Sequence, residues 1–345
     1  MAGIEKFYFT TKTSCIMNIF ITGATGYIGN QLAHKLADDG HCVHALVRNK
    51  KMIGSLKHKN IKIFFGDLNH RDEIRTAMCD CEQVYHVAGQ VRSWMKDPSI
   101  IYRVNVEGTS NVFTEAIYAG ISKVVFTSTC GVIGPSLKEP MTENDPRITG
   151  FVLDYELSKK LAEDVVQQFM KMGLNVVIVS PSKVYGPGQI SHSLTYNAFI
   201  KKFLRTGIAL IPYPGNYRGC FGYLDDIVRG HILAMEKGRT GEKYILGGVN
   251  ISYKKFFQEI KKITGHGRII PIPKFIVKAW AYWQWIQYKT FHKDPLFTPG
   301  VINHFFRNYI FSSDKAITEL GYQITPFEEA IHKTIHFLNP PNHDQ

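Results

Sequence analysis

Short apolar runs alternate with amphipathic stretches through the first half of the chain. The apolar runs predict strands, which we place at 18–22, 42–47, 61–66, 84–88, 124–128 and 176–179. The stretches between them carry apolar residues at helical spacing. Near-continuous apolar strands that alternate with helices are typical of a parallel sheet covered on both faces. The pattern therefore predicts an α/β fold built on a doubly wound parallel sheet.

The alternation breaks down after Pro187, where proline, glycine and aromatic residues become frequent. We predict that a first domain, 17–187, ends at this point. A smaller, discontinuous C-terminal lobe is expected to comprise 188–220 and 238–345. The segment between its two parts, 221–237, regains helical periodicity and is expected to return to the first domain.

Residues 1–16 lack the continuous apolar run of a signal peptide. We interpret them as an N-terminal extension. Met17 stands directly before the first predicted strand and is an alternative native start.

The composition is that of an ordinary globular protein: 345 residues, 44% hydrophobic and 20% charged, are enough for a large core. No CxxC pair is present, and the spacing of the cysteines gives no sign of a disulfide framework. We therefore expect a reducing, cytoplasmic location. The six cysteines are Cys15, Cys42, Cys79, Cys81, Cys130 and Cys220.

The formal net charge of +12 favours anionic partners, and leaves a phosphate-bearing cofactor and an acidic membrane surface open. Zinc-finger spacing, an RNA-recognition signature and a dense basic helix are all missing, so we expect no nucleic-acid partner. The fourteen histidines show no HExxH or comparable spacing, so no metal site is predicted.

A glycine-rich loop, Gly23-Ala24-Thr25-Gly26-Tyr27-Ile28-Gly29, follows the first strand and precedes a helix predicted at 30–38. Strand, glycine loop and helix stand in the order that dinucleotide binding requires. Glycines permit close backbone approach, and the helix N-terminus offers N–H donors to a pyrophosphate. The cofactor residues predicted here are Gly23, Thr25, Gly26, Tyr27, Ile28 and Gly29.

The end of the second strand carries Arg48 and no carboxylate that would grip the ribose hydroxyls of NAD. A guanidinium can make a planar, charge-assisted contact with a 2′-phosphate. The sequence therefore predicts that NADP(H) is preferred over NAD(H).

Asp67 and Leu68 close the third strand, and two interpretations of Asp67 stay open. Its carboxylate either accepts from the adenine amino group, with Leu68 supplying backbone contacts, or caps the helix that begins near Arg71.

Tyr155 and Lys159 lie four residues apart at the start of a helical pattern, and so on one helix face. A phenol has an ordinary pKa of about 10, and a nearby ammonium is expected to lower it towards neutrality. Tyr8 and Lys12 have the same spacing, but no predicted strand precedes them. The fifth strand ends in hydroxyls, of which Thr129 is the candidate to bind a substrate oxygen, with Ser128 on the cofactor side.

Together these residues resemble the extended short-chain dehydrogenase/reductases, within the NAD-dependent epimerase/dehydratase superfamily, over roughly 18–337. Further matches are His86-Val87-Ala88-Gly89, Asn105-Val106-Glu107-Gly108-Thr109 and Pro181-Ser182-Lys183-Val184-Tyr185-Gly186. Arg92-Ser93-Trp94 and Tyr244-Ile245-Leu246-Gly247-Gly248 place the chain near dihydroflavonol 4-reductases and hopanoid-associated sugar epimerases. The resemblance implies a Rossmann-type fold with a substrate-binding C-terminal lobe.

The resemblance implies that Thr129, Tyr155 and Lys159 form the catalytic set, with Lys159 also holding the nicotinamide ribose. It further implies cofactor contacts for Val87, Ala88, Gly89, Asn105, Ser128, Pro181, Ser182 and Val184. Plant flavonoid reductases carry an asparagine where this sequence has Gly134, so a flavonoid substrate is not expected.

The leading hypothesis is hydride transfer between NADPH and the carbonyl or alcohol of a small apolar substrate, such as a phenolic, terpenoid or sterol-like ketone. A sugar-nucleotide epimerase or dehydratase is the alternative, with Lys202, Arg205 and Arg218 as candidates for a diphosphate. A non-catalytic NADP sensor is a third hypothesis. A homodimer stays open.

The segment 273–291 is crowded with aromatic residues and flanked by Lys274 and Lys289. It is interrupted by Lys278 and too short for a transmembrane span. Three interpretations stay open: a core helix of the second lobe, a lid over an apolar substrate, and a weak contact with a membrane surface.

Overall fold

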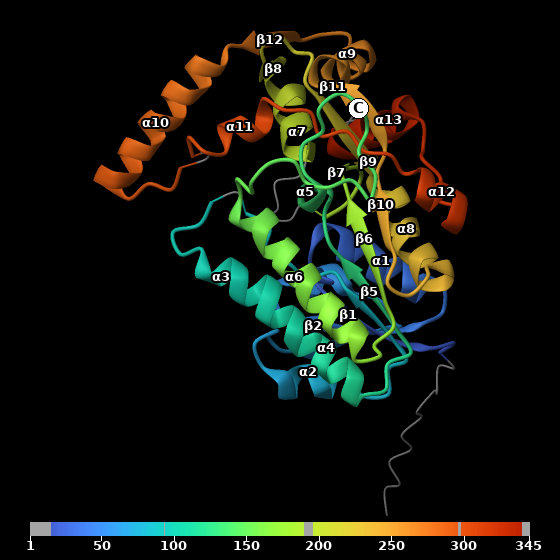
Figure 1. The fold of residues 1–345 in the computed structure, drawn as a ribbon. Helices are drawn as coiled ribbons and strands as arrows, with labels where there is room; N and C mark the ends of the chain where they lie inside the picture. Colours follow the sequence, from blue (N-terminus) through green and yellow to red (C-terminus); the bar gives the residue numbers. More distant parts are fainter. Residues whose placement is uncertain (1–14, 93, 190–195, 296–297, 340–345) are drawn as a thin grey trace, which may run out of the picture.

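The computed structural model describes residues 15–92, 94–189, 196–295 and 298–339. Its centre is a parallel seven-stranded sheet (Figure 1). In sheet order its strands are β10 (Lys243–Leu246), β6 (Val176–Pro181), β5 (Lys123–Thr127), β4 (Gln83–His86), β1 (Asn18–Thr22), β2 (Cys42–Val47) and β3 (Ile61–Phe65). The order reverses between β1 and β4, which is where open α/β sheets place their ligands.

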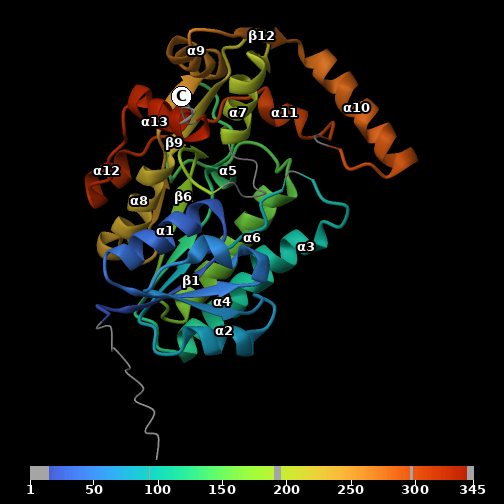
Figure 2. The same ribbon diagram turned by 180° about the vertical axis from the view of Figure 1, so that it is seen from behind.

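Helices cover both faces of this sheet (Figures 1 and 2). One face carries α1 (Tyr27–Asp38), α8 (Leu224–Lys237) and α12 (Asp314–Leu320). The other carries α2 (Arg71–Met78), α4 (Gly108–Tyr118) and α6 (Asp154–Lys171). Two apolar cores thus sandwich the sheet, and the predicted doubly wound Rossmann-type fold is confirmed.

Shorter helical turns connect these elements. They are η1 (Lys50–Leu56), α3 (Ser99–Tyr102), the π-helical η2 (Arg103–Glu107) and α5 (Cys130–Ile133).

A smaller lobe caps the carboxyl ends of the strands and has a third core of its own. It contains a three-stranded sheet, β11 (Val249–Ser252), β9 (Arg218–Tyr223) and β7 (Lys183–Tyr185), and a two-stranded sheet, β12 (Arg268–Ile272) and β8 (Ile208–Pro212). Its helices are α7 (Tyr196–Thr206), α9 (Tyr253–Thr264), α10 (Lys274–Phe291), α11 (Ile302–Phe305) and α13 (Phe327–Leu338).

The boundary between the two parts differs from the prediction at two places. Strand β10 pairs in parallel with β6, so Lys243–Leu246 is the edge of the large sheet. Helix α12 packs against α8 and β10. Both β10 and α12 fall inside 238–345, which the sequence pattern places wholly in the lobe. A four-residue strand between loops offers too short a pattern to show which sheet it joins.

The predicted strand at 84–88 also ends earlier than expected. The last residue of β4 that pairs with both neighbours is His86, opposite Thr22 on β1 and Phe126 on β5. Val87 and Ala88 therefore leave the ladder and become part of the surface that follows the strand ends.

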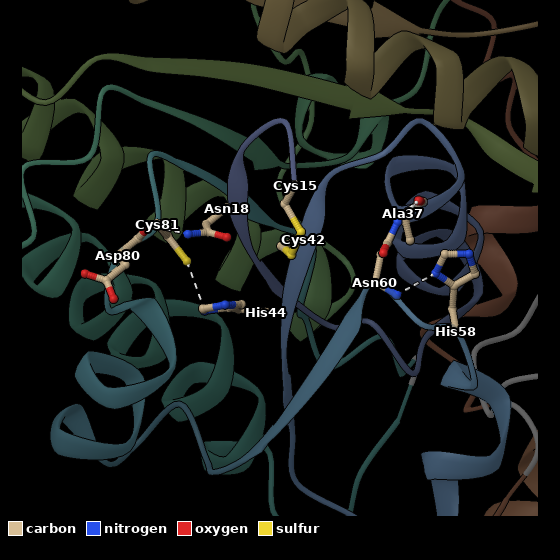
Figure 3. Close-up of a disulfide and its surroundings, with 9 residues drawn as sticks. All are labelled: Cys15, Asn18, Ala37, Cys42, His44, His58, Asn60, Asp80 and Cys81. Carbon is tan, nitrogen blue, oxygen red and sulfur yellow. Dashed lines mark hydrogen bonds between the residues drawn. A yellow bond between two sulfur atoms is a disulfide. The ribbon is translucent and has the colours of Figure 1, made fainter. Parts of the chain in front are cut away.

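A disulfide joins Cys15 to Cys42 (Figure 3). The sequence-based expectation of unpaired cysteines is wrong for these two residues. The parallel register of β1 and β2 sets Asn18 opposite Cys42, so the residues just before β1 pass close to the start of β2. Figure 3 also shows the buried thiol of Cys81, whose sulfur lies 3.3 Å from His44 Nδ1.

Candidate active site

A cavity of about 350 Å³ lies at the carboxyl ends of β1, β4, β5 and β6, beneath the second lobe. Most residues predicted to bind cofactor or to act in catalysis line it. They are Gly23, Gly26, Tyr27, Ile28, Gly29, Val87, Ala88, Gly89, Ser128, Thr129, Tyr155, Lys159, Pro181, Ser182 and Val184. The tertiary structure thus brings five sequence motifs, which lie far apart in the chain, to one surface.

The glycine loop is packed too tightly for side chains. Gly23 has φ +76°, and a Cβ on it would meet the Ala88 nitrogen at 2.6 Å. A Cβ on Gly29 would lie 2.2 Å from the Gly23 carbonyl oxygen. Helix α1 begins directly after Gly26, so the N–H groups of its first turn have no acceptor within the helix. The loop therefore fits a pyrophosphate, which accepts such donors.

Tyr27 lines the cavity and also joins the glycine loop to the second lobe. Its hydroxyl donates to the Gly186 carbonyl oxygen at 2.6 Å and accepts from Asn197 Nδ2 at 2.9 Å. Asn197 belongs to α7, so the phosphate loop and the lobe are held in one hydrogen-bonded cluster.

Five predicted cofactor residues do not line the cavity: Thr25, Arg48, Asp67, Leu68 and Asn105. Arg48 and Asp67 lie together beyond the ends of β2 and β3, with Arg48 Nη1 3.7 Å from Asp67 Oδ2. The helix-cap interpretation of Asp67 is wrong, because α2 is preceded by His70 as N-cap and Asp67 accepts from the Asn69 N–H instead. Leu68 is buried in the core beside α4.

Asn105 is buried outside the cavity and hydrogen-bonds two segments that adjoin its lining. Its Oδ1 accepts from the Gln90 N–H at 2.7 Å, and its Nδ2 donates to Ser158 Oγ at 2.8 Å. Ser158 in turn donates to the Tyr155 carbonyl oxygen at 2.8 Å. Asn105 thereby fixes the start of α6, which carries Tyr155 and Lys159.

Thr129 and Tyr155 both line the cavity, and the Thr129 hydroxyl hydrogen-bonds the phenol. Lys159 is buried on the same helix, with Nζ 4.2 Å from the ring centroid of Phe126. Ser128 donates to Glu163 Oε1 at 2.5 Å, and Lys243 binds the other oxygen of that carboxylate at 2.6 Å. The hydroxyl–phenol–amine set predicted from the sequence is thus assembled in one place.

Comparison with known proteins shows to which family this chain belongs. The model of the NAD dependent epimerase/dehydratase family matches residues 19–247, which hold the glycine loop, Thr129, Tyr155 and Lys159. The chain belongs to this family.

Curated relatives within the family cover most of the chain. A dihydroflavonol 4-reductase-like protein of Synechocystis is 30% identical over 92% of this chain and 94% of its own. Sterol demethylase protein B of Methylococcus capsulatus is 32% identical over 73% of this chain and 76% of its own. Among solved structures, UDP-glucose 4-epimerase of Thermotoga maritima with UDP-glucose has a TM-score of 0.77 at 23% identity, covering 93% of this chain and 98% of that one.

This member of the epimerase/dehydratase family is therefore an NAD(P)-dependent enzyme of the extended short-chain dehydrogenase/reductase type. Its cofactor is a nicotinamide dinucleotide, as the family's description states.

Burial governs the ionisation of Tyr155 and Lys159. It raises the pKa of Tyr155 from 10 to about 12, against the lowering effect of the hydrogen bond from Thr129. It lowers the pKa of Lys159 to about 7, against the opposing charge of Glu163. The expected lowering of the Tyr155 pKa is thus not found, because desolvation of the phenol outweighs the hydrogen bond from Thr129.

A second group of polar residues, not predicted from the sequence, includes two residues of the cavity lining, Glu156 and His304. Glu156 is 2% exposed and pairs with Arg147, Oε2 to Nη2, at 2.9 Å. Its other oxygen lies 3.5 Å from Nδ1 of His304 on α11. Burial lowers the pKa of His304, although the carboxylate raises it.

Sequence offered one partial signal for this group, because Glu156 directly follows Tyr155. Nothing local connects Arg147 or His304 to them, since α11 reaches the cavity through the fold of the lobe. Gly134, which replaces the asparagine of flavonoid reductases, has φ +108°, and a Cβ there would lie 2.9 Å from Arg147 Cγ. The glycine therefore leaves room for the Arg147 side chain.

The lobe-side wall of the cavity is otherwise aromatic and aliphatic. Its apolar members are Tyr196, Phe199, Val301, Phe305, Tyr309 and Phe311, and Lys183 Nζ lies 5.9 Å from the centroid of the Tyr196 ring. The cations proposed from sequence for a diphosphate, Lys202, Arg205 and Arg218, do not line it.

Proposed function

We propose that the protein is an NADP-dependent oxidoreductase that interconverts a ketone or aldehyde and its alcohol on a small apolar substrate. The observation that carries this proposal is the position of Thr129 and Tyr155, between the glycine-loop wall and the apolar lobe wall of one cavity. A reacting carbonyl held by these hydroxyls would face the cofactor side, with its apolar body against the lobe.

The residues of the loop side fit a dinucleotide. The first turn of α1 would bind the pyrophosphate, Lys159 the nicotinamide ribose, and Ala88, Pro181, Ser182 and Val184 would flank the cofactor. NADPH would supply the hydride.

The chain's own residues would control the proton. Thr129 and Tyr155 would hydrogen-bond the carbonyl oxygen, and Tyr155 would protonate it as negative charge develops. With a pKa of about 12, Tyr155 stays protonated at neutral pH and is a stronger acid than the alcohol that forms when an alkoxide takes up its proton. This ionisation state favours the reductive direction.

An apolar substrate is supported by the lobe wall and by the names of two relatives, which refer to a dihydroflavonol and a sterol. The epimerase alternative is supported by the fold it shares with the Thermotoga enzyme. It would need cations for a diphosphate, for which the lining offers Arg92 and Lys183, the latter beside apolar rings. Arg147 does not line the cavity and is paired with Glu156. We therefore favour the reductase.

The test is a screen of NADPH consumption with a 3-oxo steroid, a phenolic ketone and a simple aldehyde, run beside a UDP-glucose epimerisation assay. We expect turnover of at least one bulky ketone, and its loss by about 10²- to 10⁴-fold in Tyr155→Phe, which removes only the proton donor. Epimerisation without consumption of NADPH would contradict the proposal and support the alternative.

The preference for NADP(H) has its own test in Arg48→Ala. The Arg48 side chain is 68% exposed beside Asp67, in reach of solvent where a 2′-phosphate would lie. We expect about tenfold weaker NADPH binding, with NADH binding little changed, because a charge-assisted contact is lost. Lys57→Ala, an exposed cation further along the same connection, is the control. Equal or tighter NADH binding by the wild type would defeat the assignment.

A further inference from the structure

Helix α10 stands away from the rest of the second lobe in both views (Figures 1 and 2). One side of it faces the protein. Ala281 and Gln284 are its buried residues, and Ala281 packs with Ile302 and Phe306. The core interpretation of this segment is therefore wrong, because a single narrow stripe of the helix is covered.

The opposite side of α10 is apolar and exposed. Phe275, Ala279, Trp283 and Ile286 share one face, since they are spaced by four, four and three residues. Phe275 is 72% exposed, Trp283 53% and Ile286 59%. An ordinary surface helix turns polar residues outward, so this outward apolar face indicates a surface that something apolar covers.

The charge around this face is mostly positive, with Asp294 as an acidic residue near Trp283. From Arg268 to Lys293 the chain contains no aspartate or glutamate. Lys274, Lys278 and Lys289 lie on the helix itself, with Lys293 just after it. The apolar face is thus bordered by cations.

We propose that α10 binds the surface of an anionic phospholipid bilayer. Phe275, Trp283 and Ile286 would enter the boundary between headgroups and acyl chains, and the lysines would contact lipid phosphates. Aromatic residues beside lysines are the composition that favours this interface. None of the helices among the described residues is long and apolar enough to cross a membrane, so α10 would lie in the surface.

Two other occupants fit the observations less well. A second copy of the chain packed on the same face would bring the lysines of both copies together, which like-charge repulsion disfavours. A lid would contact the cavity, yet none of the described α10 residues lines it. Helix α11, which packs on α10, does line it through His304 and Phe305. If the proposed function holds, α10 would set the cavity next to a reservoir of apolar substrate.

The experiment measures binding of the full-chain protein to vesicles by cosedimentation, without substrate. The vesicles contain phosphatidylcholine alone or with about one third phosphatidylglycerol. We expect binding to the anionic vesicles that weakens as salt rises from about 0.1 M to about 0.5 M, since salt screens the lysines. Three of the four tryptophans, Trp280, Trp283 and Trp285, lie on α10, so tryptophan emission should shift to shorter wavelength on binding.

The variants test whether vesicle binding depends on α10 or on another part of the surface. Trp283→Ser with Ile286→Ser should weaken binding about tenfold or more, because two large apolar side chains no longer leave water. Lys278→Gln with Lys289→Gln should reduce the preference for anionic vesicles. The control is Tyr118→Ser with Met172→Ser, which removes two side chains that are 74% and 67% exposed elsewhere. Circular dichroism and thermal unfolding check that each variant is folded.

Three results would overturn the proposal. The first is no binding to either vesicle, and the second is binding that the folded Trp283→Ser/Ile286→Ser variant retains. The third is a concentration-dependent dimer, without vesicle binding, that this variant loses, which would assign the face to a second copy. Because no turnover is measured, failure here leaves the proposed function standing, and the reverse also holds.

Discussion

Desolvation at single side chains sets the acid–base behaviour of the active site. Tyr155 and Lys159 are both shifted by burial, in opposite directions, because burial disfavours the charged form of each. The result near pH 7 is a protonated phenol on the same helix as an amine whose pKa burial has lowered to about 7. This pairing keeps a proton available at Tyr155.

A pH dependence follows from this ionisation. Alcohol oxidation needs the phenolate as base, and below a pKa of about 12 the phenolate fraction rises about tenfold per pH unit. We expect kcat/KM for oxidation to rise steadily from pH 7 to about pH 10, while carbonyl reduction keeps its proton donor over that range. Tyr155→Phe should lose the slope. An oxidation profile that levels off near pH 7 would show that the phenol ionises far below this value.

His304 supplies a second prediction at this scale. Its ring stacks on Tyr309 at 4.2 Å between centroids and stands 3.5 Å from Glu156. His304→Phe keeps a ring but removes both nitrogens, so we expect KM for an accepted ketone to rise by up to about tenfold, with a smaller change in kcat. His304→Gln, which retains a donor, should restore part of the loss. A pure loss of kcat would instead place His304 in the chemical step.

At the scale of elements, the glycine loop and the start of α1 form one rigid unit. The backbones of Gly23 and Gly29 lie close together, and Gly23 also lies close to the backbone of Ala88, just after the end of β4. A side chain in this unit must displace backbone, which is costly because backbone cannot rotate away as a flexible side chain can.

Gly29→Ala tests the rigidity of this unit. Alanine is the better helix former by about 1 kcal/mol, yet its Cβ would lie 2.2 Å from the Gly23 oxygen. We expect a net destabilisation of about 1–3 kcal/mol and clearly weaker cofactor binding, measured by denaturant unfolding and by titration. Gly54→Ala is the matched control, because a Cβ there meets nothing within 4 Å. Unchanged cofactor affinity in Gly29→Ala would show that the loop can relax.

At the scale of the whole molecule, the site exists because the lobe closes over the strand ends. Tyr27, Gly186 and Asn197 come from α1, the end of β7 and α7, and meet in one buried cluster. This cluster fixes the lobe against the phosphate loop, and with it the apolar wall against Tyr155.

Tyr27→Phe should loosen this junction. The Gly186 carbonyl would keep its bond from Asn197 at 2.7 Å but lose the Tyr27 donor. We expect a loss of about 1 kcal/mol in the free energy of unfolding, measured by denaturant titration, and a higher KM for substrate because the two walls are less well held. Tyr118→Phe, at an exposed position, should change neither. A variant as stable as the wild type would show that the lobe is held by packing alone.

The sequence by itself determined most strands of the large sheet and the candidate reactive residues of this protein. The glycine loop, Thr129 and the Tyr155–Lys159 pair each depend on residues close together in the chain, and strands β1 and β2 have the bounds that their apolar runs predict. Such features can be predicted from local spacing, because a helix face or a strand end is fixed by a few neighbouring residues.

Tertiary structure alone decided what depends on distant segments meeting. It put β10 in the large sheet, paired Cys15 with Cys42, and set His304 beside Glu156. It also reversed the expected shift of the Tyr155 pKa and turned an apolar face of α10 outward. Burial is the common physical reason: how much of a side chain leaves water is fixed by every segment packed around it, and no local pattern contains that information.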